Sequence, residues 1–471
     1  MESSQKRYTP KTPGRRTGSI VAGGLAIAAP LGACSSSSKS TTSSPTTAGS
    51  AGGSGGTASS VAGGNSTAPG NATSGTISWW ASPITTSNPD PRTVLIQAFE
   101  KAYPNIHVNL VSAPNNTDTN RAALTTQISG GGGPDVYMGD VIWPAQFGAH
   151  QLAVPLSKYL PSSYWNTFAK GLVAGATYKG QVYGAPLFED QGFLYYRKDI
   201  LAADNLPVPT TWEQLMSDAQ QIQQKGQAQY GYVFQGADYE GATCDFMEFL
   251  ADAGGSVLNS SDDKSTLTSG SAALNALTFM QKLVQSGVSP KAESTFQETQ
   301  AMDTFDAGKA AFLRNWDYAY STSQASGSSV VGKVGVAPMP TFKGQPTPGY
   351  SNIGGWNLYV NPHSKNLAAD LTFVKWMTGT DAQNILATQF SEIPTNESVR
   401  TSPSVIASNA VLAVVPHTKL VPRPAQTPNY PAVSQAIYQN VSAVLAGTKT
   451  PQAALTAANS AINTAVSGGG L

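Results

Sequence analysis

Charged side chains are scarce in this chain of 471 residues. Aspartate, glutamate, lysine and arginine together make up only 12% of it, and 28 acidic residues balance 28 basic ones. A protein that binds nucleic acid needs a basic face, so this composition argues against nucleic acid as a partner. Glycine, proline and small polar residues are abundant instead, which is typical of a protein outside the cytoplasm.

Cysteine and histidine are few as well. The chain has two cysteines, Cys34 and Cys244, and its four histidines lie far apart, at positions 107, 150, 363 and 417. No group of these residues has the sequence spacing of a metal site. We therefore expect neither a metal nor a cofactor.

The apolar run near the N-terminus, residues 19–30, is too short for an ordinary membrane-spanning helix. Five basic residues precede it, and this order predicts a signal peptide over residues 1–33. The motif LGAC, which ends at Cys34, resembles the bacterial lipoprotein signal, in which the cysteine is lipidated and becomes the mature N-terminus. This predicts a lipid anchor on the outer face of the cell membrane. The alternative is a plain secretory signal with an incidental cysteine.

Residues 34–75 contain no aromatic residue and a single charge, Lys39. Such a segment cannot bury enough apolar surface to offset the entropy lost on ordering, so we expect a disordered tether. If Cys34 carries lipid, Cys244 has no partner for an intrachain disulfide.

The folded part is expected to begin at Thr76, with alternating strands and helices. Residues 76–81 and 106–111 read as strands, 91–104 and 121–129 as helices, and 134–140 as a third strand. A β-α-β-α-β pattern predicts a parallel sheet with helices on its faces.

The rest of the chain continues in the same style. Apolar periodicity and capping residues predict further helices over residues 210–226, 270–287 and 366–388, the last one broken at Gly379, and again from about Tyr430. Strands are expected at 309–316, 333–340 and 355–360.

Nearly the whole mature chain resembles the sugar-binding proteins of ABC importers, an extracellular solute-binding family that includes maltose- and trehalose-binding proteins. The segments that carry the resemblance occur in the order of that family: FEKAYPNIHV, GGGGPDVYMGD, YKGQVYGAPLFEDQGFLYYRKDIL, PTTWEQL, DYEGATCDFMEFLADAGG, AAFLRNWDYAY, PTFKGQ, GGWNLYVNPHSKNLAADLTFVKWM and VPRP.

This resemblance implies an α/β fold of the two-lobed, type II periplasmic-binding-protein kind, with a hinge and a ligand cleft between the lobes. Lobe 1 would comprise residues 76–188 and 347–394, and lobe 2 residues 189–346 and 395–471. The implied function is to capture an α-glucoside disaccharide, trehalose first and maltose second, and to deliver it to the permease subunits. The protein would be a monomer and not an enzyme.

Four residues match ligand-contacting positions of the family. Asp190 stands where related sugar binders place a ligand carboxylate, and Asp140 matches a position that contacts sugar. Trp316 matches the aromatic platform of the second lobe, and Arg423 in VPRP matches a cleft arginine of trehalose-like binders. The alternatives are a loop cap for Asp140, a core position for Trp316 and a surface salt bridge for Arg423.

Glu189 is a weaker candidate than its neighbour. Successive side chains of an extended strand point to opposite sides, so only one of Glu189 and Asp190 can face a given cleft. The alternative for Glu189 is a solvated or hinge-side acid.

Further candidates come from three short segments. Gly354, Gly355 and Trp356 are expected to form a turn whose backbone N–H groups approach the ligand, because glycine has no side chain. Tyr239 and Glu240 precede a helix and offer polar contacts, or else cap that helix. Three polar residues after the first strand could bind hydroxyl groups: Ser82, Thr86 and Asn88.

Two other functions remain open. A glycosidase holds two carboxyl groups about 5–10 Å apart across a sugar bond, and the number of acids here cannot exclude one. The same fold could also bind another oligosaccharide, a polyol or a polyamine. A polyamine site would have several acids and little arginine, so Arg423 in the cleft would argue against it.

Overall fold

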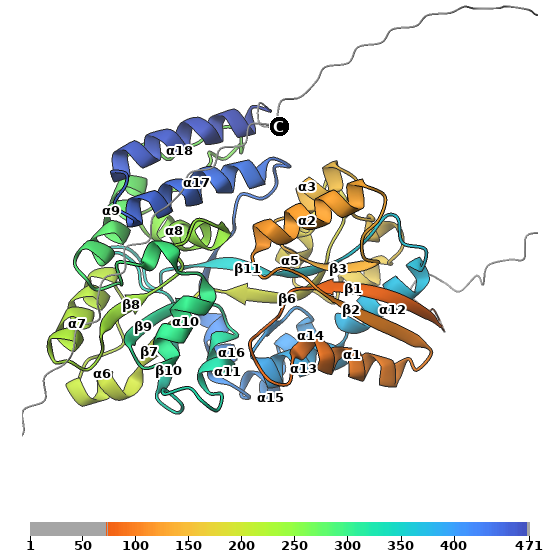
Figure 1. The fold of residues 1–471 in the computed structure, drawn as a ribbon, viewed down its shortest axis with the longest axis horizontal. Coiled ribbons are helices and arrows are strands. Elements are labelled where there is room, and N and C mark those ends of the chain that lie inside the picture. The colour runs from red at the N-terminus through yellow and green to blue at the C-terminus, as the bar shows by residue number, and fades with distance from the viewer. Residues whose placement is uncertain (1–71, 73, 469–471) are drawn as a thin grey trace, which may run out of the picture. The chain divides into compact units, whose positions relative to one another are not determined.

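The computed structural model describes residue 72 and residues 74–468 (Figure 1). The predicted signal peptide, Cys34 and nearly all of the predicted tether lie outside these residues. Within the described part of the chain, every helix is too short or too polar to cross a membrane.

Seven strands form the larger sheet. Their order is β12–β6–β11–β3–β1–β2, and β13 pairs with β11. Strand β1 pairs in parallel with β2 and β3, which confirms the β-α-β-α-β prediction, whereas β11 runs antiparallel to both β3 and β6. The bounds are β1 Gly75–Ala81, β2 Ile106–Ser112, β3 Val136–Asp140, β6 Ala185–Gln191, β11 Tyr350–Val360, β12 Ile393–Pro394 and β13 Lys419–Val421.

The smaller sheet has the strand order β10–β7–β9–β8. Its strands are β7 Phe193–Arg197, β8 Tyr230–Val233, β9 Ala310–Asn315 and β10 Val334–Ala337, and a separate hairpin pairs β4 Thr177–Tyr178 with β5 Gln181–Val182. Two sheets with helices packed on them give the expected α/β architecture.

Each predicted helix has a counterpart among the helices of the described residues, and the structure adds others that the sequence did not reveal. They are α1 Pro91–Ala102, α2 Thr117–Ser129, α3 Pro144–Ala149, α4 Ser162–Trp165, α5 Lys170–Gly175, α6 Lys198–Asp204, α7 Trp212–Gln224, α8 Glu240–Asp252, α9 Ala272–Gln285, α10 Glu298–Asp306, α11 Ala319–Ser323, α12 Leu367–Met377, α13 Thr380–Phe390, α14 Glu397–Arg400, α15 Pro403–Ile406, α16 Ala410–Val414, α17 Tyr430–Leu445 and α18 Pro451–Val466. Short 3-10 turns cover Leu156–Lys158, Glu293–Thr295 and Val415–His417.

Capping side chains set where several helices begin. The Thr211 hydroxyl accepts a hydrogen bond from the backbone N–H of Gln214 and starts α7, as expected. Helix α2 begins at Thr117, four residues before the predicted start, because Asn116 caps it by accepting from the N–H of Thr119. The apolar pattern alone did not reveal this polar first turn.

Where the chain first passes from the larger sheet to the smaller one, a single residue, Gly192, lies between the two strands. Strand β6 ends at Gln191 and β7 begins at Phe193. A Cβ atom at position 192 would lie 2.1 Å from a carboxylate oxygen of Glu248 and 2.8 Å from Nη2 of Arg314, so any other residue would displace this buried ion pair. The expected lobe bounds stay a prediction, and the bound between 188 and 189 falls inside β6.

The expected turn at Gly354, Gly355 and Trp356 is wrong, because all three residues lie in the middle of β11. The strand is irregular there: Gly355 has a φ of +116°, and the pairing with β6 shifts register between Trp356 and Asn357. A Cβ atom on Gly355 would lie 2.5 Å from the carbonyl oxygen of Phe188. The glycine is therefore required by close strand packing and not by a turn.

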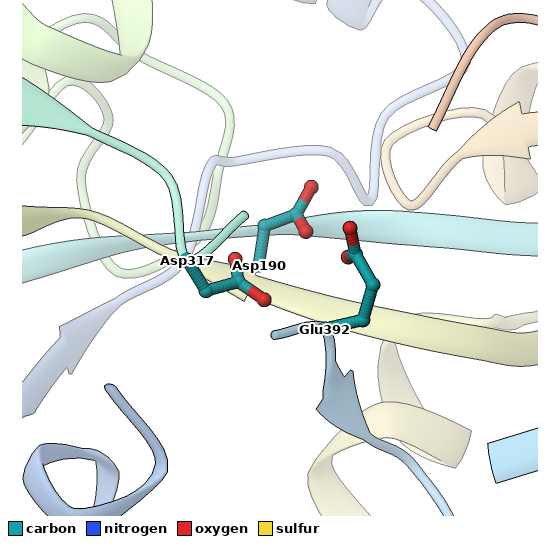
Figure 2. A group of neighbouring side chains, drawn as sticks. All are labelled: Asp190, Asp317 and Glu392. Carbon is teal, nitrogen blue, oxygen red and sulfur yellow. The ribbon is translucent and has the colours of Figure 1, made fainter. Parts of the chain in front are cut away.

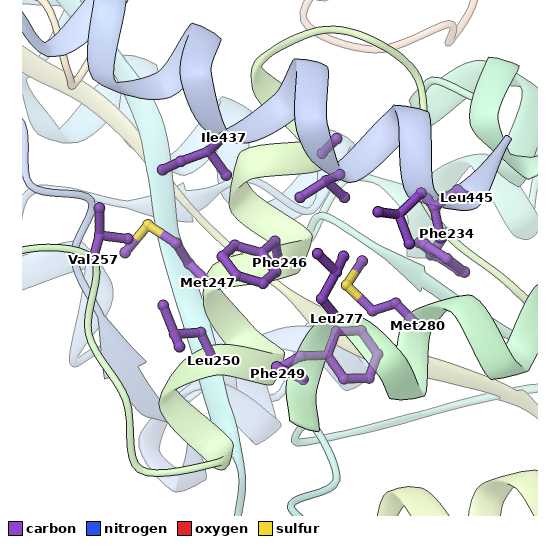
Figure 3. Close-up of a cluster of buried hydrophobic side chains, with 14 of the residues drawn as sticks. Phe234, Phe246, Met247, Phe249, Leu250, Val257, Leu277, Met280, Ile437 and Leu445 are labelled. Atoms are coloured by element: carbon purple, nitrogen blue, oxygen red, sulfur yellow. The ribbon is translucent and has the colours of Figure 1, made fainter. Parts of the chain in front are cut away.

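An apolar core beside the smaller sheet holds α8 in place. Figure 3 shows Phe246 and Phe249 of α8 packed with Leu277 and Met280 of α9 and with Ile437 of α17. All five side chains are almost fully buried. Because this core fixes α8, it also fixes Glu240, the first residue of that helix.

Candidate functional site

One cavity brings together most of the residues that the sequence singled out. Its lining includes Ser82, Thr86, Asp140, Asp190, Tyr239, Glu240, Trp316, Gly354, Gly355, Trp356 and Arg423. Two predicted residues lie elsewhere: Glu189 is not among the lining residues, and neither is Asn88, whose side chain is exposed.

Strand pairing places two of the carboxylates on either side of β11. In the register, Gly354 lies opposite Asp190 of β6, and Trp356 lies opposite Asp140, the last residue of β3. Gly354 is also needed for packing, because a Cβ atom there would lie 3.0 Å from both Asp190 and the Trp316 ring. The missing side chain lets the ring approach the strand.

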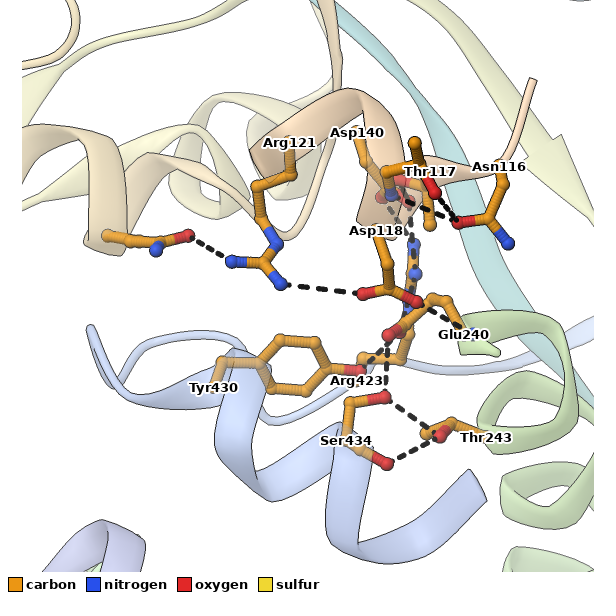
Figure 4. Close-up of polar contacts among 12 residues, drawn as sticks. Asn116, Thr117, Asp118, Arg121, Asp140, Glu240, Thr243, Arg423, Tyr430 and Ser434 are labelled. Carbon is orange, nitrogen blue, oxygen red and sulfur yellow. Dashed lines mark hydrogen bonds and ion pairs between the residues drawn. The ribbon is translucent and has the colours of Figure 1, made fainter. Parts of the chain in front are cut away.

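Arg423 connects acids from two different parts of the fold (Figure 4). Its Nη2 atom donates to Oδ1 of Asp140 at 2.8 Å, and its Nη1 atom donates to Oε1 of Glu240 at 3.0 Å. Asp140 ends β3 of the larger sheet, whereas Glu240 begins α8, which packs beside the smaller one. The three side chains are buried, so Arg423 forms a buried ion pair and not the surface salt bridge that was the alternative.

Both carboxylate oxygens of Glu240 accept hydrogen bonds, and its backbone N–H donates one. The Tyr430 hydroxyl donates to Oε1 at 2.6 Å, and the Ser434 hydroxyl donates to Oε2 at 2.5 Å. The backbone N–H of Glu240 donates to Asp118 of α2. Burial raises the pKa of Glu240 to about 7, and the nearby Arg423 opposes that rise.

A buried arginine lies beneath Trp316. The Arg314 guanidinium is 4.0 Å from the centre of the Trp316 ring, close enough for a cation–π contact. It also pairs with Glu248 at 2.6 Å and with Asp245 at 3.1 Å, and none of its side chain reaches solvent. Arg314 thus positions the tryptophan that faces the cavity.

Glu189 and Asp190 point in opposite directions, as the strand alternation predicts. Glu189 pairs with Arg400 at 2.6 Å and accepts a second hydrogen bond from the Gln191 amide. These partners hold Glu189 in the fold, on the side of β6 away from the cavity. Asp190 faces the cavity, where burial raises its pKa to about 7 and the neighbouring Asp140 carboxylate adds to the rise.

Comparison with known proteins identifies the family of this chain. Residues 85–384 match the model of the bacterial extracellular solute-binding proteins. The chain belongs to this family.

Relatives and solved structures agree with that assignment. A probable ABC transporter-binding protein from Deinococcus radiodurans is 36% identical over 366 residues, which cover 74% of this chain and 84% of that protein. A mannitol-binding protein from Pseudomonas aeruginosa is 27% identical over 362 residues, 74% of this chain and 80% of its own. The structure of maltose-bound MalE3 from T. maritima superposes with a TM-score of 0.77 at 31% identity, over 82% of this chain and 98% of that one. This solute-binding protein therefore has the type II periplasmic sugar-binding fold.

Several lining residues of this solute-binding protein escaped the sequence analysis. Glu298, Thr299 and Met302 come from the first turns of α10, and Cys244 comes from α8. Thr117 also lines the cavity, and its hydroxyl donates to Asp140 at 3.3 Å. The polar first turn of α2 was the one local signal that could have pointed to Thr117.

Two acids next to Asp190 were missed as well. Asp317 directly follows Trp316, and Glu392 directly precedes β12. Figure 2 shows their carboxyl groups gathered around that of Asp190. Asp317 stands inside the family-like segment AAFLRNWDYAY, but Glu392 carries no sequence signal.

The chemistry of the cavity suits a ligand with many hydroxyl groups. Carboxylates accept hydrogen bonds from hydroxyls with charge assistance, and the rings of Trp316 and Trp356 can cover the apolar faces of a sugar ring. The hydroxyl of Ser82 is buried, without a hydrogen-bond partner in the described residues, and is free to bind such a group.

Proposed function

We propose that this solute-binding protein captures an α-glucoside disaccharide, with trehalose first and maltose second. It then delivers the sugar to the permease subunits of an ABC importer. The observation that carries this proposal is the single cavity in which Asp140, Asp190 and Glu240 meet the rings of Trp316 and Trp356. The similarity to maltose-bound MalE3 supports the sugar class.

The two halves of the cavity favour ligand-driven closure. Asp140, Asp190 and Trp356 belong to the larger sheet. Glu240 begins α8, and Trp316 directly follows β9 of the smaller sheet. A sugar that contacts both groups stabilises the closed arrangement of the lobes relative to an open one.

Titration of the purified protein with sugars tests this function. Tryptophan fluorescence or calorimetry should give saturable binding with trehalose or maltose. Trp316→Ala should weaken binding about tenfold or more, the equivalent of about 1.4 kcal/mol, because the ring that covers the sugar face is lost. Trp376→Phe is the matched control, since this tryptophan packs on Phe99 away from the cavity. If no α-glucoside gives saturable binding, the disaccharide proposal is refuted.

A polyol is the second candidate ligand, because one relative of the chain is a mannitol-binding protein. Saturation by mannitol without a response to trehalose or maltose would favour this candidate. Release of monosaccharide from any of the sugars would instead point to a glycosidase.

We further propose that lipid on Cys34 anchors the protein, as a monomer, to the outer face of the cell membrane. The LGAC motif supports this anchor. Cys34→Ser should release the protein from the membrane fraction. Mass spectrometry should find lipid on the N-terminal peptide of the wild type and none on that of the variant. A wild-type peptide without lipid would contradict the anchor.

A further inference from the structure

Asp190, Asp317 and Glu392 bring three carboxyl groups to one point of the fold. They come from β6, from the residues after β9 and from the residues before β12, so three separate segments converge (Figure 2). One oxygen from each lies within 4.8 Å of the others.

Glu392 makes this convergence more than a contact between two aspartates. Its side chain is fully buried, and neither carboxylate oxygen has a hydrogen-bond partner. Figure 2 shows its carboxyl group directed toward that of Asp190. A buried carboxylate without a donor is costly unless it is protonated or a positive group faces it.

The other two acids are nearly as poorly satisfied. Oδ1 of Asp190 and Oδ1 of Asp317 are buried without a partner, and only Oδ2 of Asp317 accepts a hydrogen bond, from the backbone N–H of Ile393 at 2.9 Å. Four buried oxygens, counting both of Glu392, therefore have no donor.

No basic side chain in the described part of the chain hydrogen-bonds or pairs with these three acids. Two arginines that bind the neighbours of Asp190 are already paired: Arg423 binds Asp140 and Glu240, and Arg400 binds Glu189 on the opposite side of β6. The three carboxyl groups are therefore neutralised either by protons that they take up or by a cation from outside the polypeptide.

We propose that Asp190, Asp317 and Glu392 bind one divalent cation that prefers oxygen ligands, with calcium favoured over magnesium and manganese. The donor set is all carboxylate, without nitrogen or sulfur, which matches these hard cations. Calcium accepts bidentate carboxylates and irregular geometry, whereas magnesium keeps several of its waters, and this buried site leaves little room for them.

The position of Asp190 links this ion site to the large cavity. Asp190 also lines that cavity, so water or a ligand hydroxyl on the cavity side can complete the coordination shell. Only this coupling between ion and sugar rests on the proposed function. Ion binding itself requires no sugar, so the two proposals can fail separately.

Metal titration of the purified protein tests the site directly. After treatment with EDTA and dialysis, calorimetry with calcium, magnesium and manganese should show one ion bound per chain, with calcium tightest. Calcium should also raise the melting temperature. Glu392→Gln and Asp317→Asn should each weaken calcium binding about tenfold to a hundredfold or more, since the loss of a partner beyond the ligands already has an effect of that size.

Asp370→Asn is the matched control, because Asp370 is another fully buried aspartate of the larger-sheet region, bound to Ser364 and remote from the cluster. This variant should bind calcium like the wild type. Circular dichroism checks that each variant is folded.

The proposal is overturned if the wild type binds none of the three ions, or if both cluster variants bind calcium as tightly as the wild type. The other contradicting result is a melting temperature that rises on acidification and stays unchanged when each of the three metals is added. That result would show that protons, and not a metal, neutralise the cluster.

Discussion

Glu189 and Asp190 are adjacent on one strand, are equally buried and have opposite surroundings. Glu189 faces Arg400, which neutralises it, whereas Asp190 faces Asp317, Glu392 and the cavity. The alternation of β6 thus separates an acid that stabilises the fold from an acid that is left for a ligand. The difference lies in the partner that the tertiary structure supplies, and not in burial.

The same contrast extends to two arginines that are buried. Arg314 neutralises Glu248 and Asp245, and Arg423 neutralises Asp140 and Glu240. Removal of one partner from a buried ion pair is destabilising because it leaves an uncompensated charge. Removal of an acid from an uncompensated cluster should have the opposite sign.

Loss of Arg314 should have the largest effect. Arg314→Met leaves Glu248 and Asp245 buried without a cation, and we expect the free energy of unfolding to fall by about 3–5 kcal/mol. Urea denaturation followed by circular dichroism measures this change. Arg197→Met is the control, because Arg197 pairs with a partly exposed Asp199 and its loss should change stability by about 0–1 kcal/mol. Equal effects of the two substitutions would contradict the role assigned to the Arg314 network.

Loss of the Glu189 charge should give a smaller destabilisation. Glu189→Gln removes the charge that Arg400 binds, but Arg400 is partly exposed and can turn to water. We expect a destabilisation of about 1–2 kcal/mol in the same assay, with sugar affinity unchanged. A loss of sugar binding without a loss of stability would return Glu189 to the ligand site.

Asp252 is the intermediate case, with N–H donors in place of an arginine. Trp212 Nε1 and the backbone N–H of Tyr350 donate to it, yet burial raises its pKa to about 7. The folded state then holds a proton that the unfolded state releases near pH 4, so stability should fall as the pH rises from about 4 to 7. Asp252→Asn should reduce the difference in unfolding free energy between pH 5 and pH 8. An unchanged difference would show that other groups cause it.

The unpaired cluster should give the smallest effect, of the opposite sign. In buffer with EDTA, Glu392→Gln relieves repulsion among three carboxyl groups, so the melting temperature should stay equal or rise. A clear decrease in EDTA would mean that Glu392 already has a stabilising partner in the metal-free protein.

Local patterns were sufficient for the long helices, such as α1, α7 and α9, and for strands such as β1, β2 and β9, but not for the short helices. The family resemblance selected Asp190 as the acid that faces the cavity. The apolar period and the capping residues predicted α7, and strand alternation predicted that only one of Glu189 and Asp190 would face the cavity. These features depend on residues close in the sequence, so they can be read without the fold.

Other features depend on contacts between distant segments. Gly354 and Gly355 suggested a turn, but pairing on both sides of β11 makes them strand residues that cannot carry a Cβ atom. Glu392 reaches Asp190 only because β12 pairs with β6. No spacing rule connects such residues, and the acid cluster was therefore invisible in the sequence.

The place of β11 in the larger sheet also constrains the order of folding. It lies between β6 and β3, and the other neighbour of β6 is β12, which comes later still in the chain. Pairing strands that are so far apart in the sequence closes long loops, which is entropically unfavourable and slows folding. Strands β1, β2 and β3 can associate early, but β6 cannot join them before residues 350–360 are available. The wall that carries Asp140 and Asp190 thus forms late, and a chain that ends before Tyr350 would have both aspartates without the strand that brings them together.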